Sequence, residues 1–308
     1  MSETDSRGVS IKRVVVTSFV VDLLDVFTNL AVTFLSGSVV MLSQALEGGA
    51  DLISSGLLVI GHKRSAKEAD VAHPFGHGRE MYFWAMLSAL VMLGVTATLS
   101  FYFGLQRFLH PSPLENIYLA YIVLTITIFT NGYALFLSVK RLMGRKNYLN
   151  IKEAFFHSPL IETKTTLILD LMGTLASILG LIALVLYFIT GDLRYDGLGA
   201  MIIGIMIGVF SLLLLLSVFD LIIGKSASHL TKAQIRQAVL SIPEVKSILS
   251  LKTLHLGPEN LMANIDVHLE DNLTTDQIEK IIEKVKFNVK EAVPSVSQIQ
   301  IELNSPKL

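Results

Sequence analysis

Two carboxylates lie inside a mostly apolar stretch, residues 39–60, which is about long enough to cross a bilayer at roughly 20 residues per crossing. They are Glu47 and Asp51, and their i, i+4 spacing puts both on one face of a helix. A carboxylate in hydrocarbon costs at least about 2.5–3.5 kcal/mol, so the pair needs a cation, a proton or a facing polar group. The alternative is a buried hydrogen-bonded pair that only holds helices together. Acids inside membrane spans are functional by default, which favours the first interpretation.

A third acid, Asp170, lies in another apolar run, with Thr166 one helical turn before it. If the two runs pack together, three carboxylates and a hydroxyl can meet. Oxygen ligands suit Mn²⁺, Fe²⁺, Mg²⁺ or Ca²⁺ more than Zn²⁺. The same acids could carry protons in exchange, because a carboxyl group out of water holds a proton that an arriving cation can displace. Other polar groups fall on neighbouring turns of the first apolar run, at Asp22, Asp25 and Asn29.

Two further groups of side chains are candidate metal ligands. Asp70, His73 and His77 fall within eight residues of one polar loop, and the alternative is a solvated loop in which His77 caps the next helix. His268 and Glu302, with His255, lie on predicted strands near the end of the chain. Scattered side chains of these types on a sheet are usually only solvated, so both interpretations stay open.

The elements that position these residues include six apolar runs, each long enough to span a bilayer. They are residues 13–36, 39–61, 82–108, 117–139, 166–189 and 198–223. The chain has 308 residues, 52% hydrophobic and 17% charged, which is typical of a membrane protein with a soluble part. The polar start lacks a small-residue cleavage site, so we expect the first run to be a retained span. Close helix packing is indicated by the glycines of the last run, Gly197, Gly199, Gly204 and Gly208.

Composition also limits the function. The chain has no Cys, which excludes disulfides and thiolate metal sites. A net charge of −1 gives no indication of nucleic acid as a partner. No phosphate-cradling loop is present, so we expect no ATP-driven transport within this chain.

Basic residues are distributed unevenly between the two sides of the predicted spans. One side has Arg7, Lys12, Arg13, Lys63, Arg64, Lys67, Arg79, Lys140, Arg141, Arg145, Lys146, Lys152 and Lys225, whereas the opposite loops have only Arg107 and Arg194. Basic residues favour the cytoplasmic side, so we expect both termini in the cytoplasm. The basic loops fit a prokaryotic cell membrane.

The polarity of the chain rises after residue 225. Thr231 is the predicted N-cap of a helix that ends near Leu240, and Thr274 or Thr275 caps a second helix over 277–292. Strands are predicted over 246–256, 261–269 and 297–303. The order α-β-β-α-β predicts a small, ferredoxin-like α+β domain with helices on one face of a sheet. We therefore predict two domains, a six-span membrane domain over 1–225 and a cytoplasmic domain over 226–308.

Several short motifs resemble the cation diffusion facilitator family over nearly the whole chain. They are Gly37-Ser-Val39 followed by Glu47 and Asp51, Phe75-Gly-His-Gly78 before the third run, Asp196-Gly-Leu-Gly199 opening the sixth, and the α-β-β-α-β tail. The resemblance implies a homodimer that exports a divalent metal from the cytoplasm in exchange for protons. It implies a transport site at Glu47, Asp51, Thr166 and Asp170, formed by the second and fifth spans.

The sequence departs from the family's zinc carriers at some of these positions. Those carriers have His or Asp at the first position of each pair, whereas this chain has Glu47 and Thr166, so its metal and its activity stay open. The resemblance implies a metal site at all three loop positions, Asp70, His73 and His77. In the tail it implies ligands at His268 and Glu302, but Leu249 and Asn304 stand where other ligands would be.

The resemblance also implies an ion pair from Arg79 to the end of the sixth span. Gly224 occupies its acidic position, and Asp220, one turn earlier, could substitute.

The function that these observations predict is divalent cation efflux by proton antiport, with zinc, manganese, iron or cobalt as substrate. The predicted protein is a homodimer embedded in lipid, is not an enzyme, and binds neither ATP nor nucleic acid. One alternative is a metal-binding sensor or scaffold with a degenerate transport site. An intramembrane enzyme that uses the acids for acid–base catalysis is a weaker alternative, because no nucleophile accompanies them.

Overall fold

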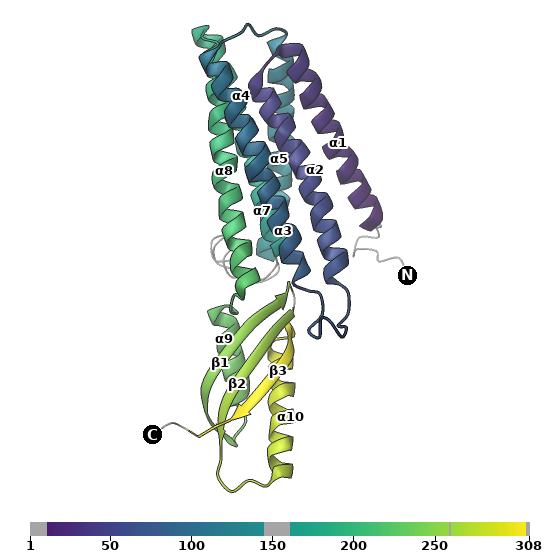
Figure 1. Ribbon diagram of the computed structural model, residues 1–308, viewed down its shortest axis with the longest axis vertical. Coiled ribbons are helices and arrows are strands. Elements are labelled where there is room, and N and C mark those ends of the chain that lie inside the picture. Colours follow the sequence, from purple (N-terminus) through teal and green to yellow (C-terminus); the bar gives the residue numbers. More distant parts are fainter. Residues whose placement is uncertain (1–10, 145–160, 259, 306–308) are drawn as a thin grey trace. The chain divides into compact units, whose positions relative to one another are not determined.

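The computed structural model describes residues 11–144, 161–258 and 260–305 (Figure 1). Within these residues the chain divides into two compact units. The first contains the residues up to Ile60 together with Trp84–Ser217, and the second contains Gly61–Phe83 and the residues from Val218 onward. Four basic residues used to predict the orientation lie outside the described residues, namely Arg7, Arg145, Lys146 and Lys152.

Long helices that run side by side make up most of the first unit (Figure 1), and residues 61–65, 80–83 and 218–223 at the ends of three of them belong to the second. Their bounds are α1 Ile11–Ser36, α2 Val39–Ser65, α3 Glu80–Val91, η1 Met92–Ala97, α4 Thr98–Leu109, α5 Ile117–Gly144, α7 Ile161–Thr190 and α8 Arg194–Ile223. They cover the predicted apolar runs to within a few residues at each end. The segment η1 is π-helical and joins α3 to α4 without a break. A tight turn joins α1 to α2, where Gly37 has a φ of +67°, a backbone conformation that favours glycine.

Four stretches of the described residues are long and apolar enough to cross a membrane. They are Glu80–Leu109, Ile117–Lys140, Thr165–Thr190 and Arg194–Ile223. This finding confirms a helical transmembrane domain. α1 and α2 have comparable lengths but carry acidic and amide side chains within their apolar sequence. Their membrane crossing, and with it the six-span topology, stays a prediction.

The backbones of α4 and α8 touch along a line of glycines. A Cβ atom built at Gly104 would lie 2.6 Å from the backbone nitrogen of Met201, and one at Gly197 would lie 2.6 Å from that of Phe108. At Gly204 the nearest atom would be the backbone nitrogen of Phe101, at 2.7 Å. No side chain fits at these distances, which confirms the predicted close packing of the last apolar run. We call Gly104, Gly197 and Gly204 the glycine seam.

The C-terminal part of the second unit is a three-stranded sheet with two helices. Its elements are α9 His229–Leu240, β1 Val245–Gly257, β2 Asn260–Leu269, α10 Thr275–Ala292 and β3 Val296–Leu303. The strand order is β1-β2-β3, with β1 antiparallel and β3 parallel to β2. Alternate residues of β2, from Leu261 to Val267, are buried in a core shared with α9 and α10. The predicted α-β-β-α-β order is confirmed.

The N-caps of the two tail helices differ from the prediction in one case. Ser228, and not Thr231, caps α9, because its hydroxyl accepts a 3.1 Å hydrogen bond from the backbone N–H of Thr231. Thr231 therefore lies inside the first turn. Thr274 caps α10 as predicted, and it forms a capping box with Gln277, whose side chain accepts a 2.8 Å hydrogen bond from the backbone N–H of Thr274.

Candidate metal sites

The structure brings the acids of α2 and α7 together. A Cβ atom built at Gly173 of α7 would lie 2.9 Å from Glu47 Oε1, so this carboxylate lies directly against the α7 backbone. One turn further along α2, Asp51 interacts electrostatically with Asp170 of α7. The two helices are thus antiparallel neighbours, and their acids lie on the facing sides.

Glu47 and Asp51 lack enough protein partners for their oxygens. Glu47 is 4% exposed, and its carboxyl group hydrogen-bonds that of Asp51. Glu47 Oε1 and Asp51 Oδ1 are buried without a hydrogen-bond partner among the residues that the structure describes. An unsatisfied buried polar atom costs about 1–3 kcal/mol, and more for a charged group. A cation or a proton at these oxygens would remove that cost.

Helix α5 supplies polar groups beside Asp170. Ser138 Oγ donates a hydrogen bond to Asp170 Oδ2. Asn131 Nδ2 would lie 2.7 Å from a Cβ atom at Gly173, the same position that Glu47 Oε1 approaches. Thr166 lies one turn before Asp170 on α7, as expected from its spacing. The acids of α2 therefore face carboxylate, hydroxyl and amide groups from α5 and α7.

The membrane acids do not close into a compact ligand group. Within residues 11–144, 161–258 and 260–305, three His or acid ligand atoms come within 4.8 Å of one another only at Asp70, His73 and His77. Glu47, Asp51 and Asp170 interact electrostatically, but their ligand atoms do not all lie within this distance of one another. A cation bound among them would have to draw the carboxylates inward or complete its shell with other oxygen donors.

The ligand spacings in the loop between α2 and α3 are compatible with a tetrahedral metal site. His73 Nδ1 lies 3.3 Å from Asp70 Oδ1, and His77 Nε2 lies 3.6 Å from Asp70 Oδ2. Ligands about 2.0–2.2 Å from a tetrahedral zinc ion lie roughly 3.3–3.6 Å from one another. The backbone N–H of His73 donates a 2.6 Å hydrogen bond to Asp70. Two imidazoles and a carboxylate are a ligand set that zinc accepts, with a fourth position left for water or another donor.

Neighbouring groups affect the charge of Asp70 and the tautomer of His77. The hydrogen bond from the His73 backbone, together with the His73 side chain and the nearby His77, lowers the pKa of Asp70 below its ordinary value of 3.8. Asp70 therefore keeps its charge in mildly acidic solution. His77 Nδ1 lies 3.2 Å from the carbonyl oxygen of Glu68. If Nδ1 carries the proton and donates it there, Nε2 is left as the metal ligand.

The expected ion pair at Arg79 is replaced by a helix-end contact. Arg79 Nη2 donates a 2.9 Å hydrogen bond to the carbonyl oxygen of Ile222 in the last turn of α8. Asp220 instead lies 3.6 Å from Lys225 Nζ. The prediction that Asp220 replaces the acidic residue missing at Gly224 is therefore wrong. Asp220 pairs with Lys225, and Arg79 donates its hydrogen bond to a backbone carbonyl.

His268 and Glu302 lie on the sheet face away from the helices, but each contacts another group. His268 Nδ1 is 3.3 Å from the carbonyl oxygen of Asn304, and Glu302 Oε1 accepts a 3.0 Å hydrogen bond from Asn264. His255 pairs with the buried Leu261 and so lies on the other face. No third His or acid joins His268 and Glu302 in a compact group in the described part of the chain. Their role as tail ligands stays a prediction.

The family assignment comes from the two halves of the chain. Residues 15–223 match the family model described as the cation efflux transmembrane domain, and residues 227–305 match that of the cation efflux protein cytoplasmic domain. The first match alone covers more than half of the chain. The chain belongs to the cation diffusion facilitator family. It is an integral, multi-pass membrane protein.

The chain is similar to several proteins of known name. The mouse (Mus musculus) mitochondrial proton-coupled zinc antiporter SLC30A9 is 26% identical over 300 residues, which cover 91% of this chain and 52% of that protein. This chain thus spans about half the length of that relative. The cation-efflux pump FieF of Shewanella oneidensis is 26% identical over 257 residues, covering 83% of this chain and 81% of that one. A nickel-form structure of a MamM C-terminal domain variant covers 26% of this chain and all of its own, at 18% identity and a TM-score of 0.24.

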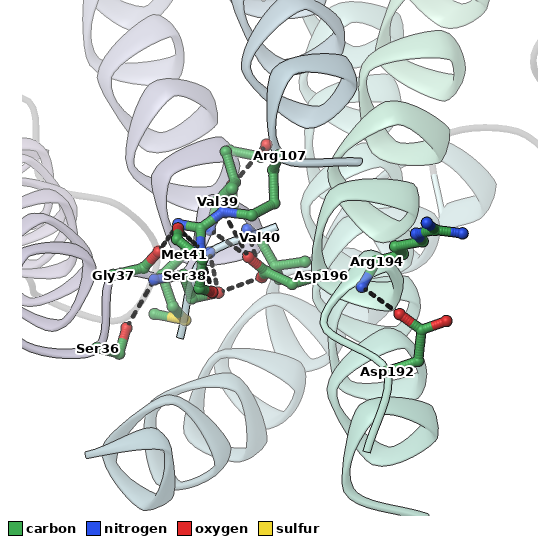
Figure 2. A network of polar contacts seen from close by, with 12 residues as sticks. Ser36, Gly37, Ser38, Val39, Val40, Met41, Arg107, Asp192, Arg194 and Asp196 are labelled. Atoms are coloured by element: carbon green, nitrogen blue, oxygen red, sulfur yellow. Dashed lines mark hydrogen bonds and ion pairs between the residues drawn. The ribbon is translucent and has the colours of Figure 1, made fainter. Parts of the chain in front are cut away.

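In this cation diffusion facilitator the Asp196-Gly motif has a structural role (Figure 2). Asp196 is 0% exposed and accepts hydrogen bonds from Ser38 Oγ at 2.5 Å and from the backbone N–H groups of Val39 and Val40. Arg107 Nε lies 3.7 Å from Asp196 Oδ2, and the same guanidinium donates a hydrogen bond to the carbonyl oxygen of Gly37. The motif thus ties the α1–α2 turn to the ends of α4 and α8.

Sequence reasoning did not identify Asn131 and Ser138 beside the membrane acids of this family member. A signal was present, because both are polar residues inside or at the end of an otherwise apolar run. Their seven-residue spacing also places them on one face of α5. The sequence could not show that this face meets α7, since it does not specify which helices pack together.

Proposed function

We propose that this chain exports a divalent cation, of the zinc, manganese, iron or cobalt class, in exchange for protons. One observation supports the proposal most strongly. The buried carboxyl groups of Glu47 and Asp51 leave oxygens without partners among the described residues, and Asp170 faces them from α7. A hydrogen bond between two carboxyl groups requires a proton between them. The pair thus has a position for a proton that an arriving cation can displace.

The proposed cycle uses the membrane acids twice. The cation enters from the cytoplasmic side and displaces protons from Glu47, Asp51 and Asp170, while Thr166 offers a hydroxyl oxygen. The helices then change their packing so that the site opens to the other side. The cation leaves as protons return. Ser138 orients Asp170 through its hydrogen bond.

The proposed architecture extends the helical membrane domain to six spans. α1 and α2 cross the membrane with the four strongly apolar stretches, and both termini lie in the cytoplasm of a prokaryotic cell. Residues 1–225 carry transport, and residues 226–308 form a cytoplasmic domain for homodimerisation and regulation. The match of residues 227–305 to a family model named for the dimer domain supports the homodimer. The chain is not an enzyme and needs neither ATP nor nucleic acid.

Two accessory sites complete the proposal. Asp70, His73 and His77 hold a divalent cation in the loop, a proposal that their ligand spacing supports. His268 and Glu302 serve as tail ligands only with further donors, which a second copy of the chain could supply.

The test is cation uptake into proteoliposomes that carry a pH gradient. The wild type is compared with Asp51→Asn and Asp170→Asn, and Asp192→Asn is the control because Asp192 lies at the exposed turn before α8. Initial rates are measured for Zn²⁺, Mn²⁺, Fe²⁺ and Co²⁺. We expect the wild type and the control to show uptake that collapses with the pH gradient, and both membrane-acid variants to lose it. Normal flux in both of those variants would contradict the mechanism.

A second function, a metal-binding sensor or scaffold, is favoured by one observation. The compact ligand group of the described residues lies in the loop and not among the membrane acids. This function predicts metal binding and a change in the tail without flux. Uptake at the background rate of empty liposomes for all four metals, with retained binding, would select it over the transporter.

A further inference from the structure

α1 carries an acidic residue, Asp25, that is not one of the four residues of the proposed transport site. Asp25 lies one helical turn before Asn29, whose Nδ2 donates a 2.9 Å hydrogen bond to Asp25 Oδ2. This bond fixes the carboxylate on the side of α1 that Asn29 occupies. Asn29 is 1% exposed, so that side is covered by protein. Asp25 thus lies at a packed helix contact and not in open lipid.

The contact is with α2, beside the acid pair. A Cβ atom built at Gly48 would lie 3.7 Å from Asp25 Oδ2 and 3.0 Å from Val26 Cγ2. Because Gly48 has no side chain, α1 approaches α2 closely at the residue that follows Glu47. Asp25 interacts electrostatically with both Glu47 and Asp51. A carboxylate from a third helix therefore lies close enough to interact electrostatically with the same pair of acids, although the three do not form a ligand group within 4.8 Å.

The amide that holds Asp25 also has an unpartnered oxygen. Asn29 Oδ1 is buried and accepts no hydrogen bond from any described residue. It belongs to the amide group that holds Asp25. Glu47 Oε1 is likewise buried and unpartnered. Buried amide and carboxylate oxygens without donors are costly on their own and are good ligands for a hard cation.

We propose that α1 supplies Asp25 as a further carboxylate ligand of the transport site, with Asn29 as the residue that positions it, and that the resulting all-oxygen site prefers Mn²⁺ to Zn²⁺. Asp25, Glu47, Asp51 and Asp170 then surround the cation from three helices. Thr166 offers only a hydroxyl from α7, and Asp25 supplies the further carboxylate from α1. Carboxylate oxygens suit Mn²⁺, whereas Zn²⁺ favours imidazole and thiolate. The inference rests on the proposed function.

The test compares Asp25→Asn with Thr28→Ala in the proteoliposome assay, using Mn²⁺ and Zn²⁺ separately. Thr28 is the matched control because it lies on the same helix, is exposed, and donates its hydroxyl to the carbonyl oxygen of Leu24 in that helix. We expect Asp25→Asn to lower Mn²⁺ uptake at least about tenfold and Thr28→Ala to change it less than about twofold. Asn29→Ala should fall between them. Asp25→Glu keeps a carboxylate and should restore most of the Mn²⁺ flux, which separates a ligand from a residue needed only for folding.

The outcomes distinguish this inference from the proposed function. Wild-type Mn²⁺ flux in Asp25→Asn, with flux lost in Asp170→Asn, would overturn the inference and leave the transporter intact. A Zn²⁺ rate above the Mn²⁺ rate in the wild type would overturn the metal preference. If no variant carries flux, Mn²⁺ binding to the detergent-solubilised chain decides, with His73→Ala and His77→Ala removing the loop site. Asp25→Asn should then weaken Mn²⁺ binding at least about tenfold, and unchanged binding would contradict the inference.

Discussion

Asp196, at the start of α8, accepts a 2.5 Å hydrogen bond from Ser38 Oγ, at the start of α2. Through this bond, and those from the Val39 and Val40 backbone, one helix caps another that precedes it by more than 150 residues. A carboxylate at a helix N-terminus satisfies free N–H groups and interacts favourably with the helix dipole. Arg107 balances the buried charge from α4. The contacts of Asp196 with Ser38 and Arg107 therefore fix the relative positions of three helix ends (Figure 2).

Replacing Asp196 with Ala should destabilise the membrane domain. The change leaves Arg107 and two backbone N–H groups without their acceptor, and breaking such a buried pair costs about 3–5 kcal/mol. We expect the Tm of the purified protein in detergent to fall on the order of 5–10 °C. Asp192→Ala removes an exposed acid four residues earlier and should change the Tm by less than about 2 °C. Equal shifts for the two variants would show that the network is not stabilising.

A single methyl group in the glycine seam should separate α4 from α8. In Gly204→Ala the new Cβ would lie 2.7 Å from the backbone nitrogen of Phe101, so the helices must move. Overpacking of this kind costs about 1–3 kcal/mol. Gly132→Ala is the control, because a Cβ there meets nothing within 4 Å and Ala favours a helix by about 1 kcal/mol. We expect thermal unfolding to shift down for the first variant and slightly up for the second.

The cap of α10 gives a test in the tail domain. Thr274→Ala removes both the side-chain acceptor and the capping box, and should cost about 1 kcal/mol. Thr275→Ala changes the next residue, which lies inside the helix, and should be neutral or slightly stabilising. Chemical denaturation followed by circular dichroism compares the two. A larger loss for Thr275→Ala would mean that the helix begins one residue later.

The loop site should bind Zn²⁺ and release it on mild acidification. Because the pKa of Asp70 is lowered, the stability that its charge provides is present above its ordinary value of 3.8 and is lost only as the pH falls below it. Asp70 therefore stays ionised at pH 5. Protons compete with the metal at imidazole ligands between pH 5 and 8, so we expect Zn²⁺ affinity to fall between pH 7 and pH 5.

Calorimetry on the solubilised protein measures this loop binding. His77→Ala and Asp70→Asn should each weaken Zn²⁺ binding at pH 7 at least about tenfold, whereas His110→Ala, at the exposed end of α4, should not. If binding is as tight at pH 5 as at pH 7, the histidines are not the ligands.

Local patterns predicted the elements well, because each depends on residues close in the sequence. The apolar runs that became α5 and α8 and the alternating residues of β2 are examples. Contacts between distant segments were harder to predict. Arg79 was expected to pair with an acidic side chain, but it donates to the backbone carbonyl of Ile222. Every residue has such a carbonyl, so the residue type gives no signal for this contact. The polar face of α5 and the approach of Asp25 to Gly48 likewise depend on which helices pack together.

The glycine seam has a consequence for motion. Helices that meet through side chains can slide, because methyl and methylene groups adjust by rotation. At Gly197 and Gly204 every atom found next to a built Cβ belongs to the backbone of the facing helix, and at Gly104 two of the three do. Because sliding would bring backbone against backbone, we expect α4 and α8 to move together in the proposed transport cycle while the other helices shift relative to them.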